Sequence, residues 1–168
     1  GETTTEWKAE DQVVCGDAMP ECSGTFGINM DYRGIFLNMS FYYQFGGQTY
    51  NQTLVDRVEN ADVGLNVDKR IYNAVWKKPG DRVDFSYNPH RLTKPSSRFV
   101  QDLNELRLSS LNVGYDFRHC AFLKKSRLQQ LKASFYMDDV FRASTVKTER
   151  GLTYPFARTF SFSLQATF

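Results

Sequence analysis

Residues that could act as acids, bases or nucleophiles are few in this chain and widely spaced. The two histidines are His90 and His119, and neither is accompanied by a Ser or Cys in a recognisable nucleophile motif. Asp138 and Asp139 are adjacent, but neighbouring residues of a strand point to opposite faces. A polar-facing Asp138 at the end of a strand is the simpler interpretation. We therefore expect no catalytic residue and no enzymatic activity.

The cysteines do not have the spacing of a zinc site. A disulfide between Cys15 and Cys22 would close a small exposed loop in an oxidising compartment. An equally good interpretation is that both thiols are unpaired. Cys120 stands alone. Three carboxylates of the middle region match no EF-hand calcium loop: Asp62, Asp68 and Asp81. We expect neither a metal site nor a cofactor.

The composition indicates strands with two different faces. The chain has 168 residues, of which 15% are aromatic, yet its mean hydropathy is −0.49. That combination suits a transmembrane barrel, which has one face in lipid, one in water, and polar loops. The net charge of +2 comes without a basic stripe, so no nucleic-acid partner is expected. No apolar run is long enough for a transmembrane helix, and we expect any export signal to lie outside this chain.

Apolar and polar residues alternate with period two in several segments, which predicts strands with one apolar face. In the last segment, alternate positions are occupied by Phe160, Phe162, Leu164, Ala166 and Phe168. Residues 26–33, 35–46 and 131–138 show the same alternation. A fifth strand over about 106–117 is less regular, because Leu106 and Leu108 have the opposite parity to Leu111 and Val113. Either a bulge resets the register or the strand continues beyond the membrane; we favour the second.

The length of these faces separates a membrane barrel from a soluble β-sandwich. Sandwich strands are short, with turns every 8 to 12 residues or so, whereas a strand crossing a bilayer at a tilt needs about 9 to 11 residues. The faces here reach that length, and aromatic residues gather near their ends, as in the interfacial girdles of membrane barrels. The pattern therefore predicts an all-β fold of antiparallel transmembrane strands.

The connections fit the same topology. Arg33-Gly34 predicts a tight hairpin turn, as expected of a periplasmic turn. Residues 46–102 form a long connection, as expected of an extracellular loop. Two short helices are predicted within the long loop. The spacing of Val55 and Val58 indicates the first, and that of Val67, Ile71 and Val75, which follow Asn66 as N-cap, indicates the second. We expect residues 1–23 to be an extracellular loop segment and 24–168 to hold the last five or so strands. About five strands cannot close a barrel, so we expect this chain to be part of a larger one.

Several motifs resemble the C-terminal region of the SusC/RagA family of TonB-dependent outer-membrane transporters of Bacteroidetes. In order along the chain, they cover residues 46–51, 56–62, 76–81, 97–100, 106–108 with 111–115, 139–141 and 154–162. The resemblance extends from about Gly24 to Phe168. It implies a barrel of twenty-two strands with an N-terminal plug domain, which imports glycans or peptides. It also implies a SusD-like surface lipoprotein as partner, energy from TonB, and a plug and a TonB-contacting segment that this chain does not contain.

The resemblance gives roles to two groups of side chains. The inward-facing polar residues would line the barrel lumen and face the plug before the substrate: Asn29, Asp31, Asn38, Gln44, Asn112, Asp116, Lys132 and Asp138. Four aromatic residues near the barrel mouth could stack on sugar rings or peptide side chains: Tyr50, Tyr72, Trp76 and Tyr87. We favour a second interpretation of these aromatic residues, in which they form the loop's own core or touch the lipoprotein.

The last strand resembles the signal that the barrel-assembly machinery reads, with Phe160, Phe162 and the terminal Phe168 as the residues concerned. Two functions from different classes follow. The first is part of an outer-membrane importer of oligosaccharides or peptides. The second is a soluble all-β carbohydrate-binding module that uses the exposed aromatic residues. The importer segment should need detergent, whereas the soluble module should unfold cooperatively in plain buffer.

Overall fold

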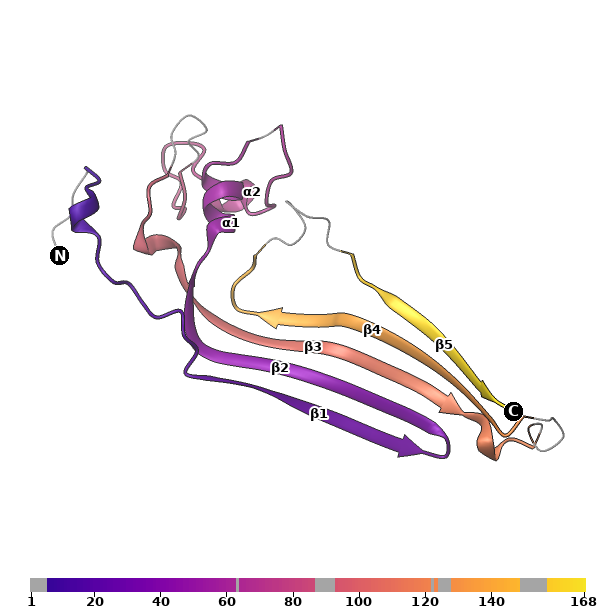
Figure 1. The fold of residues 1–168 in the computed structure, drawn as a ribbon. Coiled ribbons are helices and arrows are strands. Elements are labelled where there is room, and N and C mark those ends of the chain that lie inside the picture. Colours follow the sequence, from indigo (N-terminus) through magenta and orange to yellow (C-terminus); the bar gives the residue numbers. More distant parts are fainter. Residues whose placement is uncertain (1–5, 63, 87–92, 122, 124–127, 149–156) are drawn as a thin grey trace. The chain divides into compact units, whose positions relative to one another are not determined.

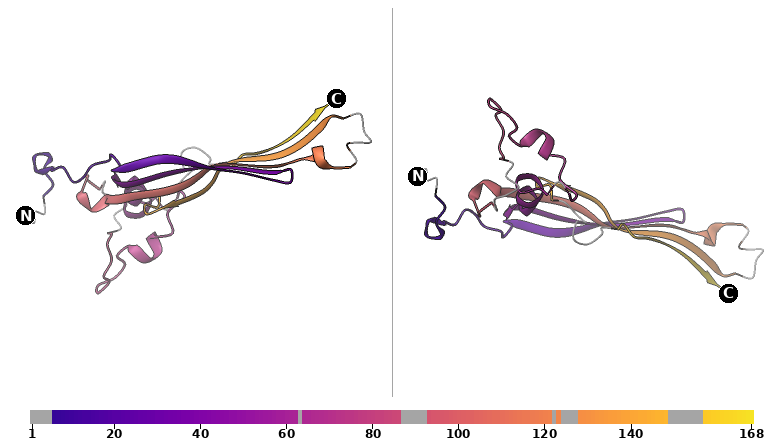
Figure 2. Two further views of the ribbon diagram at one scale, coloured as in Figure 1. Left: turned by 90° about the horizontal axis from the view of Figure 1, so that it is seen from below. Right: turned by 90° about the horizontal axis from the view of Figure 1, so that it is seen from above.

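The computed structural model describes residues 6–62, 64–86, 93–121, 123, 128–148 and 157–168. Its main element is a five-stranded sheet in which each strand neighbours the next along the chain. The strands are β1 (Cys22–Tyr32), β2 (Ile35–Tyr50), β3 (Val100–Asp116), β4 (Gln130–Ser144) and β5 (Phe160–Thr167). They lie side by side in Figure 1, and the edge-on views of Figure 2 show their twist. The predicted all-β antiparallel fold is confirmed.

The register reproduces the alternation of the sequence. Across β1 and β2, Phe26 is opposite Phe41 and Ile28 opposite Met39, while Asn29 is opposite Asn38. The pairing of β4 with β5 follows the same rule, with apolar pairs such as Phe135 with Phe162. Directly opposite residues of an antiparallel pair share a face. Each hairpin therefore has one apolar and one polar face.

The turn between β1 and β2 consists of Arg33 and Gly34, whose φ angles are +49° and +92°. Two consecutive positive φ angles are those of a type I′ turn, whose twist matches that of the flanking strands. Arginine tolerates this conformation only at a cost, whereas glycine adopts it freely. The predicted tight hairpin is therefore present, at the predicted residues.

Four strands are longer than the alternation predicts. β1 begins at Cys22, β2 continues to Tyr50, β3 begins at Val100 and β4 runs to Ser144. The register of β3 with β4 shifts between Leu108 and Ser110, next to Asp139, whose φ is +49°. The irregularity of the fifth predicted strand is thus a bulge, which is the interpretation that we did not favour.

The chain divides into two compact units. The loop unit comprises Gly1–Pro20, Gly47–Leu103 and Val146–Pro155, and the sheet unit comprises Glu21–Gly46, Asn104–Thr145 and Phe156–Phe168. Short helical turns are η1 (Ala9–Asp11), α1 (Gln52–Leu54), η2 (Val55–Glu59), α2 (Ile71–Ala74) and η3 (Ser97–Phe99) in the loop unit, and η4 (Phe117–His119) in the sheet unit. Among the described residues, none of the helices has the length and apolarity needed to cross a membrane.

The first helix predicted in the loop is present, and the second is shorter than predicted. α1 and η2 form a continuous helical segment from Gln52 to Glu59, and Asn51 caps it by accepting a hydrogen bond from the Leu54 amide. The predicted helix after Asn66 is reduced to α2, whose N-cap is Arg70. The helix begins later than expected, because the Asp68 carboxylate accepts from the backbone and the guanidinium of Arg70 in a local turn before it.

The loop unit has a hydrophobic core of its own. It contains Leu54, Val55, Val58, Val75 and Phe99, with Ile71 and Phe85 packed against it. Val58 and Phe99 have no exposed surface. Next to this core, the buried Glu59 carboxylate accepts from Arg98 at 2.8 and 2.9 Å and from the Ser86 hydroxyl at 2.9 Å. The core and this ion pair give the loop a defined structure.

Candidate functional site

The eight polar residues predicted to share a face lie on the same side of the sheet, which we call the polar face. They are Asn29, Asp31, Asn38, Gln44, Asn112, Asp116, Lys132 and Asp138. In the register Asn29 is opposite Asn38 and Asp116 is opposite Lys132. The Lys132 ammonium of β4 lies 4.2 Å from the centre of the Phe36 ring of β2, so side chains of the two hairpins contact each other on this face.

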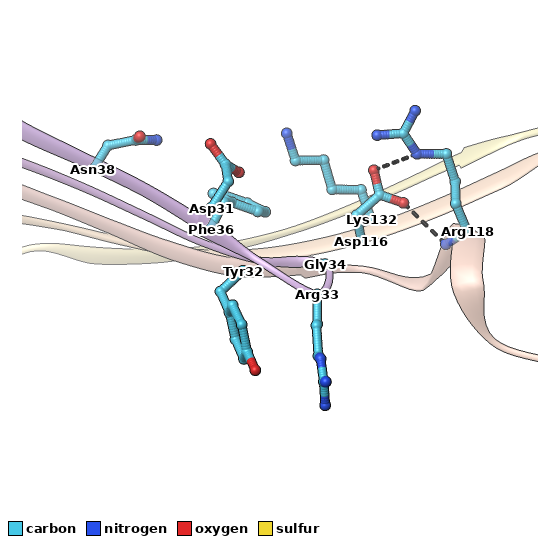
Figure 3. A pocket seen from close by; sticks show the side chains of 9 residues that line it. All are labelled: Asp31, Tyr32, Arg33, Gly34, Phe36, Asn38, Asp116, Arg118 and Lys132. Atoms are coloured by element: carbon cyan, nitrogen blue, oxygen red, sulfur yellow. Dashed lines mark hydrogen bonds and ion pairs between the residues drawn. The ribbon is translucent and has the colours of Figure 1, made fainter.

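A cavity of about 530 Å³ lies on the polar face beside the Arg33-Gly34 turn. Figure 3 shows Asp31, Asn38, Lys132, Asp116 and Arg118 projecting to one side of the ribbon. Tyr32 and Arg33 point to the other side.

The charges in this turn-end cavity are mixed. Asp116 pairs with Arg118 at 2.8 Å and accepts from the side chain of Gln130 at 2.9 Å. Carboxylates and cations are both present, so the cavity offers donors and acceptors to a polar protein surface and does not select a single charge sign.

A second polar group, which the sequence analysis missed, lies by the register shift. Arg107 of β3 is directly opposite Arg142 of β4. Arg142 pairs with Glu105 at 2.6 Å, and the Arg107 guanidinium lies 5.2 Å from the centre of the Tyr42 ring. Tyr42 belongs to the polar face, since its hydroxyl donates to Gln44 at 2.7 Å. We call Glu105, Arg107, Arg142 and Tyr42 the arginine cluster.

The same register shift places Leu106 and Leu108 on the opposite side from Arg107, together with Phe141, the partner of Leu108. This is the side of Phe41 and Tyr43. Alternation alone assigned Leu106 and Leu108 to the wrong side, because it cannot show where a bulge falls. The doublet Asp138-Asp139 was the local signal that could have located it: Asp138 stays on the polar face and bonds to Tyr136, while Asp139 takes a positive φ.

The apolar face of the sheet unit is exposed along its edge strands β1 and β5, and the apolar residues in the middle of the sheet are half-buried. The exposed fraction is 77% for Phe162, 71% for Leu164 and 56% for Met30. Some rings stack on one another, such as Phe26 on Phe41 at 4.8 Å between centres, but this leaves the outer side of the face uncovered. Apolar patches of this extent are not left in water by soluble proteins. The face must be covered by an apolar medium or partner.

Three of the four aromatic residues proposed to bind substrate lie in the described part of the loop unit. Tyr72 and Trp76 expose 69% and 49% of their surface and are not part of the loop core. Tyr50 packs edge-on against Phe99 at 5.8 Å between ring centres, with 36% exposed. Tyr87 lies outside the described residues, as does His90. The described aromatic residues are therefore available on the surface, with Tyr50 anchored to the core.

The carboxylates considered as calcium ligands are used in local turns. Asp62 accepts from the Gly64 amide, Asp68 pairs with Arg70 at 2.6 Å, and Asp81 accepts from two backbone amides. The Arg70 guanidinium beside Asp68 holds the pKa of that carboxyl below its usual value. Among the described residues, no group of His, Cys, Asp and Glu is arranged to hold a metal.

Cys15 and Cys22 are both exposed and neither is in a disulfide in the structure; the Cys15 thiol donates to the Val13 carbonyl at 3.2 Å. Cys120 is not in a disulfide either, and its sulfur lies 3.8 Å from the Tyr115 hydroxyl.

Comparison with known proteins gives relatives of one kind. TonB-dependent receptor P3 of Formosa agariphila is 26% identical to this chain over 184 residues, which cover 97% of the chain and 18% of the relative. The chain thus spans less than a fifth of the length of that protein. No protein-family model matches the chain.

The similar solved structures have the same fold at lower identity. The RagAB peptide importer in its 'open-open' state matches with a TM-score of 0.72 at 17% identity, over 99% of this chain and 19% of the solved chain. In its 'closed-closed' state it matches with a TM-score of 0.64 at 16% identity, over 86% of this chain and 16% of the solved chain. The five strands are therefore of the kind found in outer-membrane transporter barrels.

Proposed function

We propose that this chain, a barrel segment of the SusC/RagA family of TonB-dependent outer-membrane transporters, forms part of the wall of a nutrient importer. The observation that carries the proposal is the sheet with one exposed apolar face and one polar face. Lipid covers the apolar face in a membrane barrel, and the polar face lines the lumen. The related transporters support import as the function, and we assign no enzymatic activity to the chain.

The edges of the sheet support a larger barrel. β1 and β5 each have a single neighbouring strand within the described part of the chain. An unpaired strand edge is not tolerated in hydrocarbon, because each free N–H and C=O loses its hydrogen bond to water. In the proposal, other strands of the same transporter pair with these edges, and its plug domain packs against the polar face around the turn-end cavity.

The proposed substrates are peptides or oligosaccharides. A structure similar to this chain is that of the RagAB peptide importer. By analogy, we propose a SusD-like surface lipoprotein as partner and TonB, acting through a segment outside this chain, as the source of energy. In this topology residues 1–23 and the connection from β2 to β3 are extracellular, and the Arg33-Gly34 turn is periplasmic. Tyr72 and Trp76 are then the exposed aromatic residues that would meet the lipoprotein or the substrate.

The test uses the full-length transporter in its own bacterium. Deletion of its gene should abolish growth on one class of peptide or oligosaccharide supplied as the sole nutrient, and the gene in trans should restore it. An affinity tag on the transporter should recover a surface lipoprotein from outer membranes dissolved in mild detergent. Recovery of the protein in the soluble fraction, with unchanged growth of the deletion strain on every substrate tried, contradicts the proposal.

The last strand has its own proposed role in assembly. Phe160, Phe162 and Phe168 expose between 64% and 82% of their surface. We propose that they form the signal recognised by the barrel-assembly machinery. Removal of Phe168 from the full-length protein should lower the amount of transporter in the outer membrane, while each assembled copy should import at the normal rate. Normal amounts of the truncated transporter in the outer membrane would exclude this role.

A further inference from the structure

The arginine cluster carries an imbalance of charge that the fold alone does not explain. Arg107 and Arg142 are directly opposite each other on neighbouring strands, and like charges in that position destabilise a sheet. One carboxylate, Glu105, stands beside them, is 6% exposed and is bonded to Arg142 at 2.6 Å. Within the described residues, Arg107 has no carboxylate at ion-pair distance. The two guanidinium groups therefore have one neighbouring carboxylate between them, and it is bonded to Arg142.

The guanidinium of Arg107 is oriented but not satisfied. Its centre lies 5.2 Å from the centre of the Tyr42 ring, so an aromatic face supports it and restricts its position. The Nε atoms of both arginines are buried and have no hydrogen-bond partner among the described residues. A buried donor without an acceptor costs about 1 to 3 kcal/mol. These Nε atoms are too buried for a ligand to reach, so an anion would meet the Nη groups of the two arginines, whose planar donors match two oxygens.

We propose that Arg107 and Arg142 form a binding subsite for a carboxylate group of the imported substrate, which makes acidic peptides or acidic oligosaccharides the preferred cargo. This inference rests on the proposed function, because it needs the polar face to line a transport lumen. Glu105 holds Arg142 in place, Tyr42 holds Arg107, and the carboxylate of the substrate occupies the position between the guanidinium groups. Glu105 also competes with the substrate for Arg142, which keeps the binding reversible.

The experiment compares acidic and neutral probes on the full-length transporter in detergent, by isothermal titration calorimetry. The probes are tetraglutamate with tetraglutamine, and tetragalacturonate with a neutral tetragalactan. One acidic probe should bind more tightly than its neutral counterpart. R107Q should weaken binding of that acidic probe by about tenfold, the loss expected for one charge-assisted interaction, and leave the neutral probe unchanged.

Two further variants separate a binding role from general electrostatics. R33Q removes the same amount of charge from the hairpin turn, where the side chain points to the other side of the sheet (Figure 3), and should not change the preference. E105Q removes the competing carboxylate and should strengthen binding of the acidic probe. If R107Q does not assemble, as judged by heat-modifiable migration on gels, E105Q against wild type decides the question.

Three results would overturn the subsite. They are equal or absent binding of the acidic and neutral probes, an unchanged preference in R107Q, and an R107Q transporter that loses thermal stability without probe while it retains the preference. The last result would mean that a carboxylate of the transporter itself occupies the position. In each case, growth of the bacterium on its nutrient and outer-membrane assembly remain independent readouts of the proposed function.

Discussion

The loop unit and the sheet unit differ in where their apolar side chains are buried. In the loop unit Val58 and Phe99 have no exposed surface, whereas in the sheet unit Phe162 and Leu164 are more than 70% exposed. The loop buries its apolar groups within its own residues, by the hydrophobic effect in water. The sheet leaves them outward and gains their burial only from a surrounding apolar phase. The loop should therefore keep its structure through contacts within its own residues, and the sheet through those with its environment.

The largest expected effect separates the loop core from the barrel. Phe99→Ala removes a fully buried ring and should cost about 3 to 5 kcal/mol of the stability of the loop unit. In cells carrying the full-length transporter, an added protease should then cleave the loop faster, while heat-modifiable migration of the barrel stays normal. Tyr72→Ala, at an exposed aromatic residue of the same unit, is the matched control and should change neither readout. Equal losses of loop and barrel in the Phe99 variant would contradict the separation.

The next effect concerns the sheet alone. Leu164→Arg places a charge on the apolar face of β5 and should cost about 2 to 4 kcal/mol if that face lies near the middle of the bilayer. The measurement is the assembled fraction of the full-length transporter in outer membranes. Ser163→Arg adds the same side chain to the polar face, because Ser163 is opposite Ser134. The two variants should differ strongly, and similar assembly of both would remove the argument for lipid contact.

A smaller effect sharpens the description of the loop. The Asn51 side chain has no exposed surface, donates to Gln101 at 2.8 Å and to the Lys147 carbonyl, and accepts from the Leu54 amide. Asn51→Ala should cost about 1 to 3 kcal/mol, because the partners are left unsatisfied. Hydrogen exchange of the peptide covering α1 and η2 should become faster. Asn51→Ser keeps an acceptor that suits a helix N-cap and should lose less; exchange as fast as in the alanine variant would assign the effect to the donated bonds alone.

The smallest effect is a dependence on pH confined to the loop unit. The hydrogen bond from Arg70 is the main cause that lowers the pKa of Asp68 in the folded state. This contribution is present above the unfolded pKa of about 3.9 and is lost as the pH falls through the lower, folded pKa. It is worth about 1 kcal/mol or less, because the pair is partly solvated. Protease resistance of the loop should fall less between pH 6 and about 3 in Asp68→Asn than in wild type. Parallel curves would show that Asp68 contributes nothing.

The sequence predicts the sheet better than the loop for a physical reason. The alternation of apolar and polar residues reflects which side of a strand is exposed to water, so the two faces of β1, β2, β4 and β5 follow directly from residue types. The Arg33-Gly34 turn follows from the conformations that a two-residue hairpin requires. The arginine cluster was not found, because periodicity does not show where the register of β3 with β4 shifts, and such a shift changes which residues of the two strands share a side.

The loop depends on contacts between distant segments, which periodicity does not contain. The four-residue spacing of Val67, Ile71 and Val75 predicts more helix than α2 has. The ion pair of Asp68 with Arg70 forms a local turn at the start of that segment and competes with a helix. Phe99 is distant in sequence from Val58, yet both belong to one core.

If the sheet is part of a barrel wall, as proposed, the register shift near Asp139 also bears on the hydrophobic thickness of that wall. Without it, the apolar row of β3 would begin at Leu111 and extend about 10 Å along the membrane normal, taking about 3.3 Å per residue and a strand tilt of about 40°. With Leu106 and Leu108 returned to the apolar face, the row from Leu106 to Tyr115 extends about 23 Å. The apolar band of outer-membrane barrels is about 25 Å tall. In the proposed barrel wall, the apolar row of β3 thus has about the height of that band.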